Sequence, residues 1–277
     1  MLRTLLSVVA ATAIAIASPQ VLAQQQRLLI ATEGTLPPWN MTGADGRLIG
    51  FEVDLAGDLC RRMNIQCEIV PHEWDGILPG LQQGLYDAVM GGVSITAERE
   101  RAVDFSTAYA ADPAIFAVLA DAQLARKLPA VEKVDLNSNT PRTAIPQIAD
   151  ALQGRTVGVI VSTTHARMME TLLPHVAVKA YDRIDNAIID LLIGRVDAVL
   201  SARSTLENAA QKEPGRIATV GPAFFGGPLG RGVGVAVRKG SGLSARFSAA
   251  IAEAAQDGTA SRLSVKWFGF DATGAMP

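Results

Sequence analysis

Hydrophobic positions in the first part of the chain follow two alternating patterns. The apolar run at 28–31 has the length of a buried strand, and from Phe51 to Met63 apolar residues recur every fourth position, as on one stripe of an amphipathic helix. The alternation continues through three further elements, a strand at 67–70, a helix through 77–85 and a strand at 87–90. Strands that alternate with helices predict parallel sheets connected by crossover helices.

The second half of the chain repeats this alternation. The expected elements are a strand at 156–161, a helix at about 164–173, a helix around 184–192 and a strand at 196–200. The segment 84–90 (GLYDAVM) also resembles 194–200 (GRVDAVL), and in both a helix ends at glycine and leads into a strand. We therefore expect two similar α/β lobes, in which Asp87 and Asp197 cap equivalent turns and are not catalytic.

Two other stretches differ from this alternation. Residues 120–152 are polar and rich in turn formers, with the weakest periodicity in the chain, so we expect an extended surface excursion of the second lobe. Residues 243–267 return to a helical pattern.

The first 23 residues have the composition of a secretory signal peptide. Arg3 supplies the positive charge, residues 5–17 are apolar or small, and small or modest residues precede the expected cleavage after Ala23. The alternative is a membrane anchor, but the apolar run is shorter than the roughly 20 residues that span a bilayer. We therefore expect an exported, periplasmic protein.

Composition narrows the possible partners. The 277 residues carry a formal net charge of −2 without a basic patch, which argues against nucleic-acid binding. In an oxidising compartment we expect Cys60 and Cys67 to form a disulfide, although two buried free thiols remain the alternative. The three histidines have no ligand spacing near the cysteines, so we expect no metal site, and no sequence motif indicates a cofactor.

Ligands of open α/β sheets bind beyond the carboxyl ends of the strands, and the loop at 91–96 follows one such strand. Gly91 and Gly92 allow a ligand close to the backbone, and Ser94 offers a hydroxyl. Arg99, in the first turn of the helix that follows, is poorly placed for the helix dipole. Its guanidinium beside backbone N–H groups indicates a carboxylate site, with a solvated surface charge as the alternative.

A second loop of this kind contains Thr163 and Thr164 ahead of a helix. Hydroxyl and N–H groups at a helix N-terminus favour an anion, and ordinary N-capping is the alternative. Trp39 and Trp74 lie on loops between strands and helices, where each is expected either to form a wall of the ligand site or to join the core.

Two further residues near these loops have simpler expected roles. Arg203 is expected to face solvent, and His165 is expected to be a surface or packing residue. No nucleophile–base pair and no nucleotide-binding motif is recognisable in the sequence.

These residues resemble a known family. The specific stretches are 50–56 (GFEVDLA), 59–67 (LCRRMNIQC), 94–99 (SITAER), 109–112 (YAAD) and 257–259 (DGT). Over residues 27–270 the chain resembles a family 3 extracellular solute-binding protein of the polar amino-acid type, particularly the lysine/arginine/ornithine and histidine receptors of ABC importers. The resemblance implies a type II periplasmic binding fold, with two lobes joined by two crossover hinge strands. We expect lobe one to comprise 24–111 and 221–277, and lobe two 112–220.

The resemblance also implies roles for single residues. Arg99 matches the residue that binds the ligand α-carboxylate, and Ser94, the Gly92 backbone and Thr164 match its partners. Glu33 matches an acid that meets the ligand side chain. Trp74 falls on the side-chain wall, and Cys60 and Cys67 match the disulfide of the family.

The chain departs from the family pattern at several positions. Ala202 replaces the aspartate that receives the ligand α-ammonium, and Leu36 replaces an aromatic residue that stacks on the ligand side chain. Gly91 and Gly92 replace two serines. Because a buried ammonium without a carboxylate partner costs several kcal/mol, we expect a carboxylate solute other than a standard free α-amino acid.

The function expected from the sequence is therefore that of a monomeric receptor that delivers a carboxylate-bearing solute to a membrane-embedded ABC permease. One alternative is a periplasmic enzyme on the same scaffold, similar to cyclohexadienyl dehydratases, for which Glu33 and His165 are the candidate acid or base. Another is a ligand-sensing partner of a membrane receptor.

Overall fold

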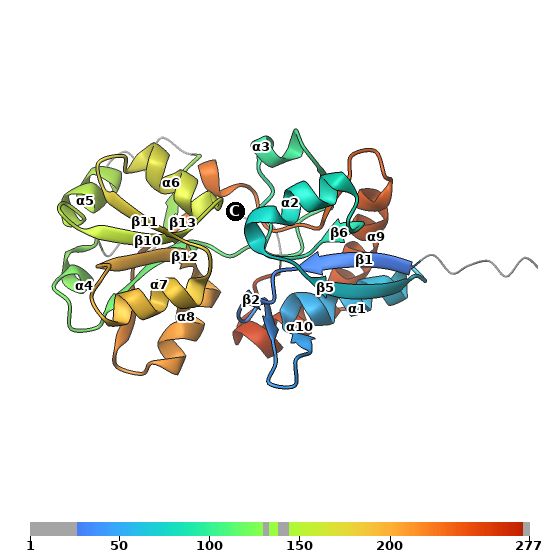
Figure 1. Ribbon diagram of the computed structural model, residues 1–277, viewed down its shortest axis with the longest axis horizontal. Coiled ribbons are helices and arrows are strands. Elements are labelled where there is room, and N and C mark those ends of the chain that lie inside the picture. The colour runs from blue at the N-terminus through green and yellow to red at the C-terminus, as the bar shows by residue number, and fades with distance from the viewer. Residues whose placement is uncertain (1–26, 130–132, 138–143, 274–277) are drawn as a thin grey trace, which may run out of the picture.

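The structure, a computed structural model, describes residues 27–129, 133–137 and 144–273. Two β-sheets, each with its own helices, form two lobes that lie side by side (Figure 1). The expected signal peptide lies outside the described residues. Within the described ranges, no helix has both the length and the apolar composition needed to cross a membrane.

The first lobe contains a five-stranded sheet and is built from both ends of the described chain. Its strands, in spatial order, are β5 (Gln66–Pro71), β1 (Arg27–Thr32), β6 (Ala88–Val89), β14 (Ala236–Val237) and β7 (Asp104–Phe105). Its helices are α1 (Phe51–Arg62), α2 (Trp74–Gln83), α3 (Ala97–Glu100), α9 (Leu243–Gln256) and α10 (Thr259–Phe268). A small antiparallel sheet, which the sequence patterns did not predict, joins β2 (Thr35–Leu36), β3 (Asn40–Thr42) and β4 (Leu48–Ile49).

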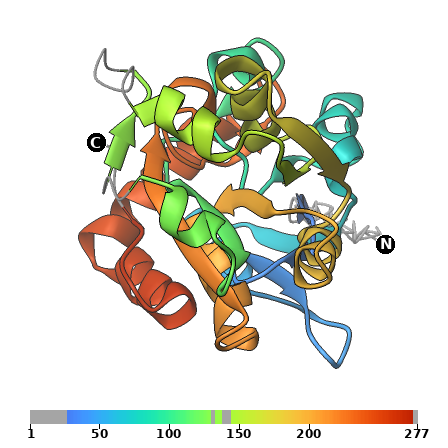
Figure 2. The same ribbon diagram turned by 90° about the vertical axis from the view of Figure 1, so that its left-hand side faces the viewer.

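The second lobe contains a six-stranded sheet and faces the viewer in Figure 2. Its strands, in spatial order, are β11 (Ala177–Tyr181), β10 (Thr156–Ile160), β12 (Ala198–Ala202), β8 (Ala114–Leu119), β13 (Ile217–Phe225) and β9 (Lys133–Asp135). Its helices are α4 (Leu124–Lys127), α5 (Ala144–Ala151), α6 (Thr164–Leu172), α7 (Ile184–Leu192) and α8 (Arg203–Lys212), followed by the 3₁₀ turn η2 (Gly227–Leu229).

Each lobe contains the same arrangement of parallel strands and helices, as the repeated sequence segment predicts. The order β1–α1–β5–α2–β6 in the first lobe corresponds to β10–α6–β11–α7–β12 in the second, and both sets of strands are parallel. The carboxylate of Asp87 accepts a hydrogen bond from the Leu29 backbone N–H, and that of Asp197 accepts one from Thr156. The expected structural role of both aspartates is therefore confirmed.

The expectation of parallel sheets with crossover helices is incomplete, because an antiparallel strand is added to the parallel strands of each lobe. Strand β14 pairs antiparallel with β6, and β8 pairs antiparallel with β12. Both strands belong to the segments that run from one lobe to the other. No crossover helix therefore sets their direction, and they can run antiparallel to their neighbours. The two connections also pair with each other, since the Val233 N–H donates to the Ala110 carbonyl at 2.8 Å.

The lobe boundaries expected from the sequence stay a prediction. Strand β13 keeps pairing with the second sheet as far as Phe225, beyond the expected boundary at residue 220. A register shift between Val220 and Phe224 allows this long strand to continue.

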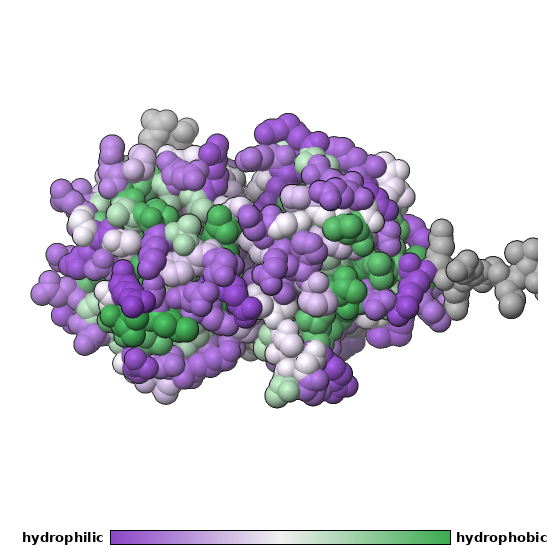
Figure 3. All heavy atoms as spheres, in the orientation of Figure 1, coloured by the Kyte–Doolittle hydropathy of each residue, from purple (hydrophilic) through white to green (hydrophobic). Residues whose placement is uncertain are grey.

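The described end of the stretch 120–152 packs into the second lobe, unlike the expected surface excursion. Helix α5 lies within it, and Ile148 and Leu152 are fully buried in the core of the second lobe. The expectation was wrong for this part because the helix has only 8 residues, too few for a recognisable helical period. Ile189 within α7 and Ile193 just after it are exposed hydrophobic side chains of this lobe. Figure 3 shows that hydrophobic residues gather in a patch on the visible face of the second lobe.

Candidate functional site

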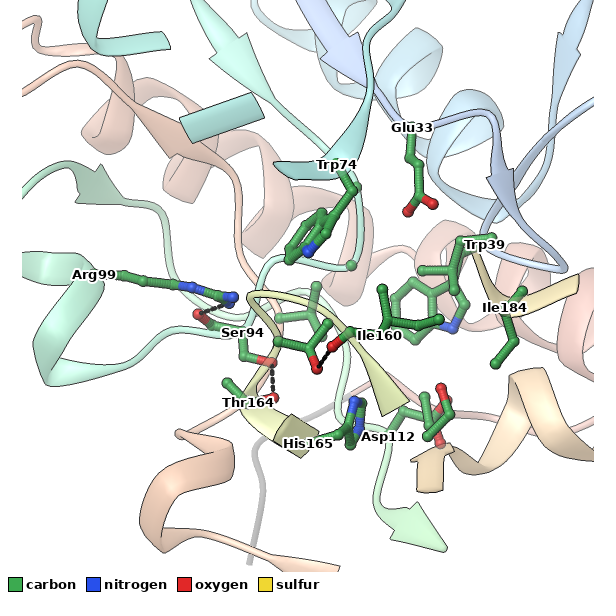
Figure 4. Close-up of a pocket in the computed structure, with 17 residues that line it drawn as sticks. Glu33, Trp39, Trp74, Ser94, Arg99, Asp112, Ile160, Thr164, His165 and Ile184 are labelled. Carbon is green, nitrogen blue, oxygen red and sulfur yellow. Dashed lines mark hydrogen bonds between the residues drawn. The ribbon is translucent and has the colours of Figure 1, made fainter. Parts of the chain in front are cut away.

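A pocket lies between the two lobes, at the ends of strands β6, β10 and β12. It brings together every ligand-site residue predicted from the sequence, namely Glu33, Trp39, Trp74, Gly91, Gly92, Ser94, Arg99, Thr163, Thr164 and Ala202. Seven further residues complete the lining, namely Leu36, Asp112, Ile160, His165, Ile184, Ser201 and Val233. Figure 4 shows their side chains converging from both lobes.

Arg99 dominates one end of this pocket (Figure 4). Thr96 caps α3 by accepting the Arg99 backbone N–H at 3.2 Å, which places the arginine in the first turn. The guanidinium donates to the Ser94 carbonyl at 3.1 Å and to the Ser162 carbonyl of the other lobe at 3.3 Å, and it lies 5.4 Å from the centre of the Trp74 ring.

The charge of Arg99 is poorly compensated. Burial lowers its pKa to about 10, and no described carboxylate lies within ion-pair distance of it. A half-buried guanidinium with hydrogen-bonding capacity to spare favours an anion, and a carboxylate fits its planar pair of donors.

The loop with Gly91 and Gly92, which lies beside Arg99, also has a structural role. Gly92 adopts a φ of +65°, and its N–H donates to the buried carboxylate of Glu52 at 2.7 Å. Glu52 also accepts hydrogen bonds from Asn40 and Tyr109, so its position is held from three sides. The Gly92 N–H is therefore already occupied, and Ser94 is the group of this loop that is free to turn its hydroxyl toward the other lobe.

The second lobe supplies the N-terminus of α6. The Thr163 hydroxyl accepts the Ala166 N–H at 3.2 Å and donates to the Ile160 carbonyl at 2.7 Å, so capping accounts for it. The hydroxyl of Thr164 lies 3.5 Å from that of Ser94 across the cleft. Of the two threonines, Thr164 is thus the one whose hydroxyl meets the other lobe beside Arg99.

The two tryptophans have different surroundings. Trp39 is 1% exposed, packs against Phe51 and Phe268 in the core of the first lobe, and donates through its indole N–H to Ser204 at 2.8 Å. Trp74 is only partly buried and donates to the Val161 carbonyl at 3.0 Å. Trp39 is mainly a core residue that reaches the pocket, whereas Trp74 forms a wall between the lobes.

Acidic groups line the rest of the pocket. Glu33 points into it from the loop after β1 (Figure 4), and burial raises the pKa of its carboxyl group. Asp112 lies at the connection between the lobes, and burial raises its pKa to about 6. The sequence analysis named Asp112 only as part of the family stretch 109–112. Its position in the pocket depends on the path of the segment that connects the lobes, which no local pattern predicts.

His165 also lines the pocket, although the sequence favoured a surface or packing role. Burial and then the charge of Arg99 lower the pKa of its imidazole to about 4, so the ring is neutral near pH 7. In the sequence, the position of His165 directly after Thr164, at the start of α6, could have indicated that it lines the pocket. Arg203 is exposed and pairs with Glu207, as expected for a solvent-facing arginine.

The pocket holds no set of groups suited to a metal. Within the described ranges, no three histidine, cysteine, aspartate or glutamate side chains come close enough together to coordinate an ion. The expected disulfide between Cys60 and Cys67 is present in the first lobe, distant in sequence from the pocket residues of the second lobe. Its link between α1 and β5 confirms the pairing expected for an exported chain.

Two α/β lobes joined by paired connections, with a pocket of apolar walls and a few polar groups between them, define a solute-binding protein. Residues 28–270 match the family described as bacterial extracellular solute-binding proteins, family 3. The chain belongs to this family, and the resemblance noted from the sequence is confirmed.

Individual relatives differ in the solutes for which they are named. An octopine-binding periplasmic protein of Rhizobium meliloti is 37% identical, over 94% of this chain and 96% of its own. A solved ancestral arginine-binding protein bound to glutamine is 31% identical, with a TM-score of 0.73 over 88% of this chain and 98% of its own. A solved ancestral amino-acid-binding protein, AncCDT-1, described as a precursor of cyclohexadienyl dehydratase, is 27% identical, with a TM-score of 0.73 over 87% and 95%.

Proposed function

We propose that this protein is the periplasmic receptor of an ABC importer and that it captures a basic amino-acid derivative with a substituted α-nitrogen. The observation that carries the proposal is the pocket between Arg99 and Ala202, which offers a cation at one end and no acid at the position of Ala202. An octopine, in which the α-nitrogen of arginine carries a second carboxylate-bearing group, is a ligand of this class.

Charge at the Arg99 end supports a carboxylate. The guanidinium is half-buried and has no ion-pair partner among the described residues, and the Ser94 and Thr164 hydroxyls lie next to each other across the cleft. A ligand carboxylate there would replace the water that the arginine lost on burial with charge-assisted hydrogen bonds.

Glu33 supports a cationic group on the rest of the ligand. Its carboxyl group lines the pocket, has no ion-pair partner among the described residues, and receives a hydrogen bond from the Thr35 hydroxyl only. A guanidinium or ammonium on the ligand side chain would stabilise the ionised form of this buried acid.

The remaining parts of the proposal concern the route of the solute. We propose that a signal peptide at 1–23 exports the chain, that it acts as a monomer in the periplasm, and that it delivers its solute to a membrane-embedded permease. The family and the periplasmic relatives support this location.

We propose binding without turnover, although one alternative is an enzyme similar to cyclohexadienyl dehydratase. The pocket does contain acid or base groups in Glu33, Asp112 and His165. The octopine-binding relative is named for binding, and so is the solved ancestral protein from which a dehydratase descends. Incubation with prephenate or arogenate should yield no product, and catalytic product formation would replace the proposal with the enzyme.

Calorimetric titration with octopine, arginine, lysine and histidine at pH 7 tests the ligand class. Octopine is expected to bind more tightly than the three free amino acids. In a separate unfolding experiment, octopine at 100-fold its Kd should add about 2.7 kcal/mol to the free energy of unfolding. Tighter binding of free arginine, lysine or histidine would exclude the substituted nitrogen.

Two arginine variants test the carboxylate site. Arg99→Ala should weaken octopine binding by about 30-fold or more, because it leaves a ligand carboxylate buried without its partner. The exposed Arg101, just after α3, provides the matched control, and Arg101→Ala should bind as the unchanged protein does. Equal losses in both variants would show that charge alone attracts the ligand.

A further inference from the structure

One acid of the pocket, Asp112, forms no ion pair among the described residues. Asp112 lies just before β8, whose first residue Ala114 pairs with Ala202 at the end of β12. The Arg203 N–H donates to the Pro113 carbonyl at 2.8 Å, which keeps the two strand ends together. Asp112 is therefore next to Ala202 on the neighbouring strand, and Figure 4 shows its carboxylate at the opposite end of the pocket from Arg99.

The hydrogen bonds of Asp112 come from a single residue. Its two oxygens accept the Ser204 backbone N–H at 3.1 and 3.3 Å, and one of them also accepts the Ser204 hydroxyl. No cationic side chain in the described ranges forms an ion pair with this carboxylate. The nearby Arg203, whose charge favours the ionised form of Asp112, is exposed and pairs with Glu207. Burial raises the pKa of Asp112 to about 6, and the hydrogen bonds from Ser204 and the charge of Arg203 offset this only in part.

We propose that Asp112 binds a cationic nitrogen of the ligand and thereby supplies, from the neighbouring strand, the acid that is missing at Ala202. The small side chain of Ala202 leaves room for a substituent on that nitrogen, so the site fits a secondary ammonium group. This inference rests on the proposed function, because it assigns the nitrogen of the same ligand whose carboxylate meets Arg99.

Asp112 also caps the start of helix α8, and this structural role must be distinguished from ligand binding. Helix α8 has Ala202 at its N-cap position, where no side chain caps the helix, and Asp112 accepts the Ser204 N–H in its place. The Ser204 hydroxyl in turn accepts the indole N–H of Trp39 from the first lobe. Capping explains the hydrogen bonds of Asp112, and its loss would weaken the binding of all ligands alike.

The experiment compares octopine with its ether analogue, in which oxygen replaces the secondary nitrogen. Asp112→Asn keeps the size of the side chain and an oxygen that can accept the Ser204 N–H, but it removes the charge. We expect this variant to bind octopine about 30-fold more weakly and the ether analogue within about threefold of the unchanged protein. Ser204→Ala, which disturbs the cap but keeps the Asp112 charge, should change both affinities by the same factor.

The outcomes separate this inference from the proposed function. Equal changes for octopine and the ether analogue in Asp112→Asn would overturn the role of Asp112 and leave the proposed ligand class intact. An unchanged octopine affinity in that variant would have the same consequence. Failure of the unchanged protein to bind octopine would overturn the proposed function together with this inference.

Discussion

His165 illustrates at the residue scale how burial changes the chemistry of a side chain. Its ring lies in the cleft next to Thr164, where burial and the charge of Arg99 disfavour the imidazolium form. In the unfolded chain the imidazole is free to take up a proton at an ordinary pKa of about 6.5. Protonation therefore favours the unfolded state at acidic pH.

The sign of the resulting pH dependence follows from the lowered pKa. The stability linked to His165 is fully present above about pH 6.5 and is lost as the pH falls toward 4. Between pH 7.5 and pH 5, we expect the unchanged protein to lose about 1–2 kcal/mol more unfolding free energy than His165→Gln. Urea unfolding of both proteins at the two pH values measures this difference.

His175 provides the control for that measurement. It lies on the surface after α6, so replacing it with glutamine is expected to leave the pH dependence of the unchanged protein in place. If His165→Gln lost as much stability on acidification as the unchanged protein, the histidine would not be the group that senses pH.

At the scale of single elements, the end of α1 shows how local covalent chemistry supports the fold. Leu55 and Leu59 are fully buried on one face of the helix, and Cys60 on its last turn is bonded to Cys67 at the start of β5. Between them the chain turns sharply, with Asn64 at a φ of +53°. The disulfide restricts this short connection in the unfolded chain.

Removing the disulfide should lower the stability of the first lobe. We expect the double variant Cys60→Ser, Cys67→Ser to lose roughly 2 kcal/mol of unfolding free energy, because the unfolded chain regains the freedom of the short loop. Urea unfolding without reductant measures the loss, and reductant should lower the unchanged protein to the level of the variant. Coinciding curves for the oxidised protein and the variant would contradict the expectation.

At the scale of the whole molecule, direct contacts hold the lobes together around the pocket. The indole of Trp74 donates to the Val161 carbonyl, and Arg99 donates to the Ser162 carbonyl. The Ser162 hydroxyl also donates to Asp75 on α2 at 2.6 Å. Ser162 adopts a φ of +59°, which is uncommon for a residue other than glycine, so both of its contacts with the first lobe come from a constrained turn.

These contacts predict that the cleft is partly held closed without ligand. Asp75→Ala and Ser162→Ala should each increase the ratio of open to closed molecules by about two- to tenfold, which corresponds to the net value of one hydrogen bond. The radius of gyration from small-angle X-ray scattering of the ligand-free protein measures the change. The double variant serves as the control, since it should open no further than either single variant, and additive effects would show that the two residues do not act through one bond.

Much of the fold follows from local patterns. The stripe of apolar residues from Phe51 marks α1, and the repeated glycine–aspartate turn marks the shared core of the lobes. The stretch containing α5 and the small sheet of β2, β3 and β4 were missed, because their elements are short and depend on packing against distant parts of the chain.

The sequence by itself indicated the α/β alternation, the disulfide and the loop residues around Arg99 that line the pocket, because each depends on residue type and near neighbours. Only the tertiary structure decided that the Gly92 N–H serves Glu52, that Trp39 belongs mainly to the core, and that His165 and Asp112 reach the pocket. The physical reason is that the pocket forms between two lobes. Its lining depends on how the connections cross and on how closely the lobes approach, and neither is encoded in a local pattern.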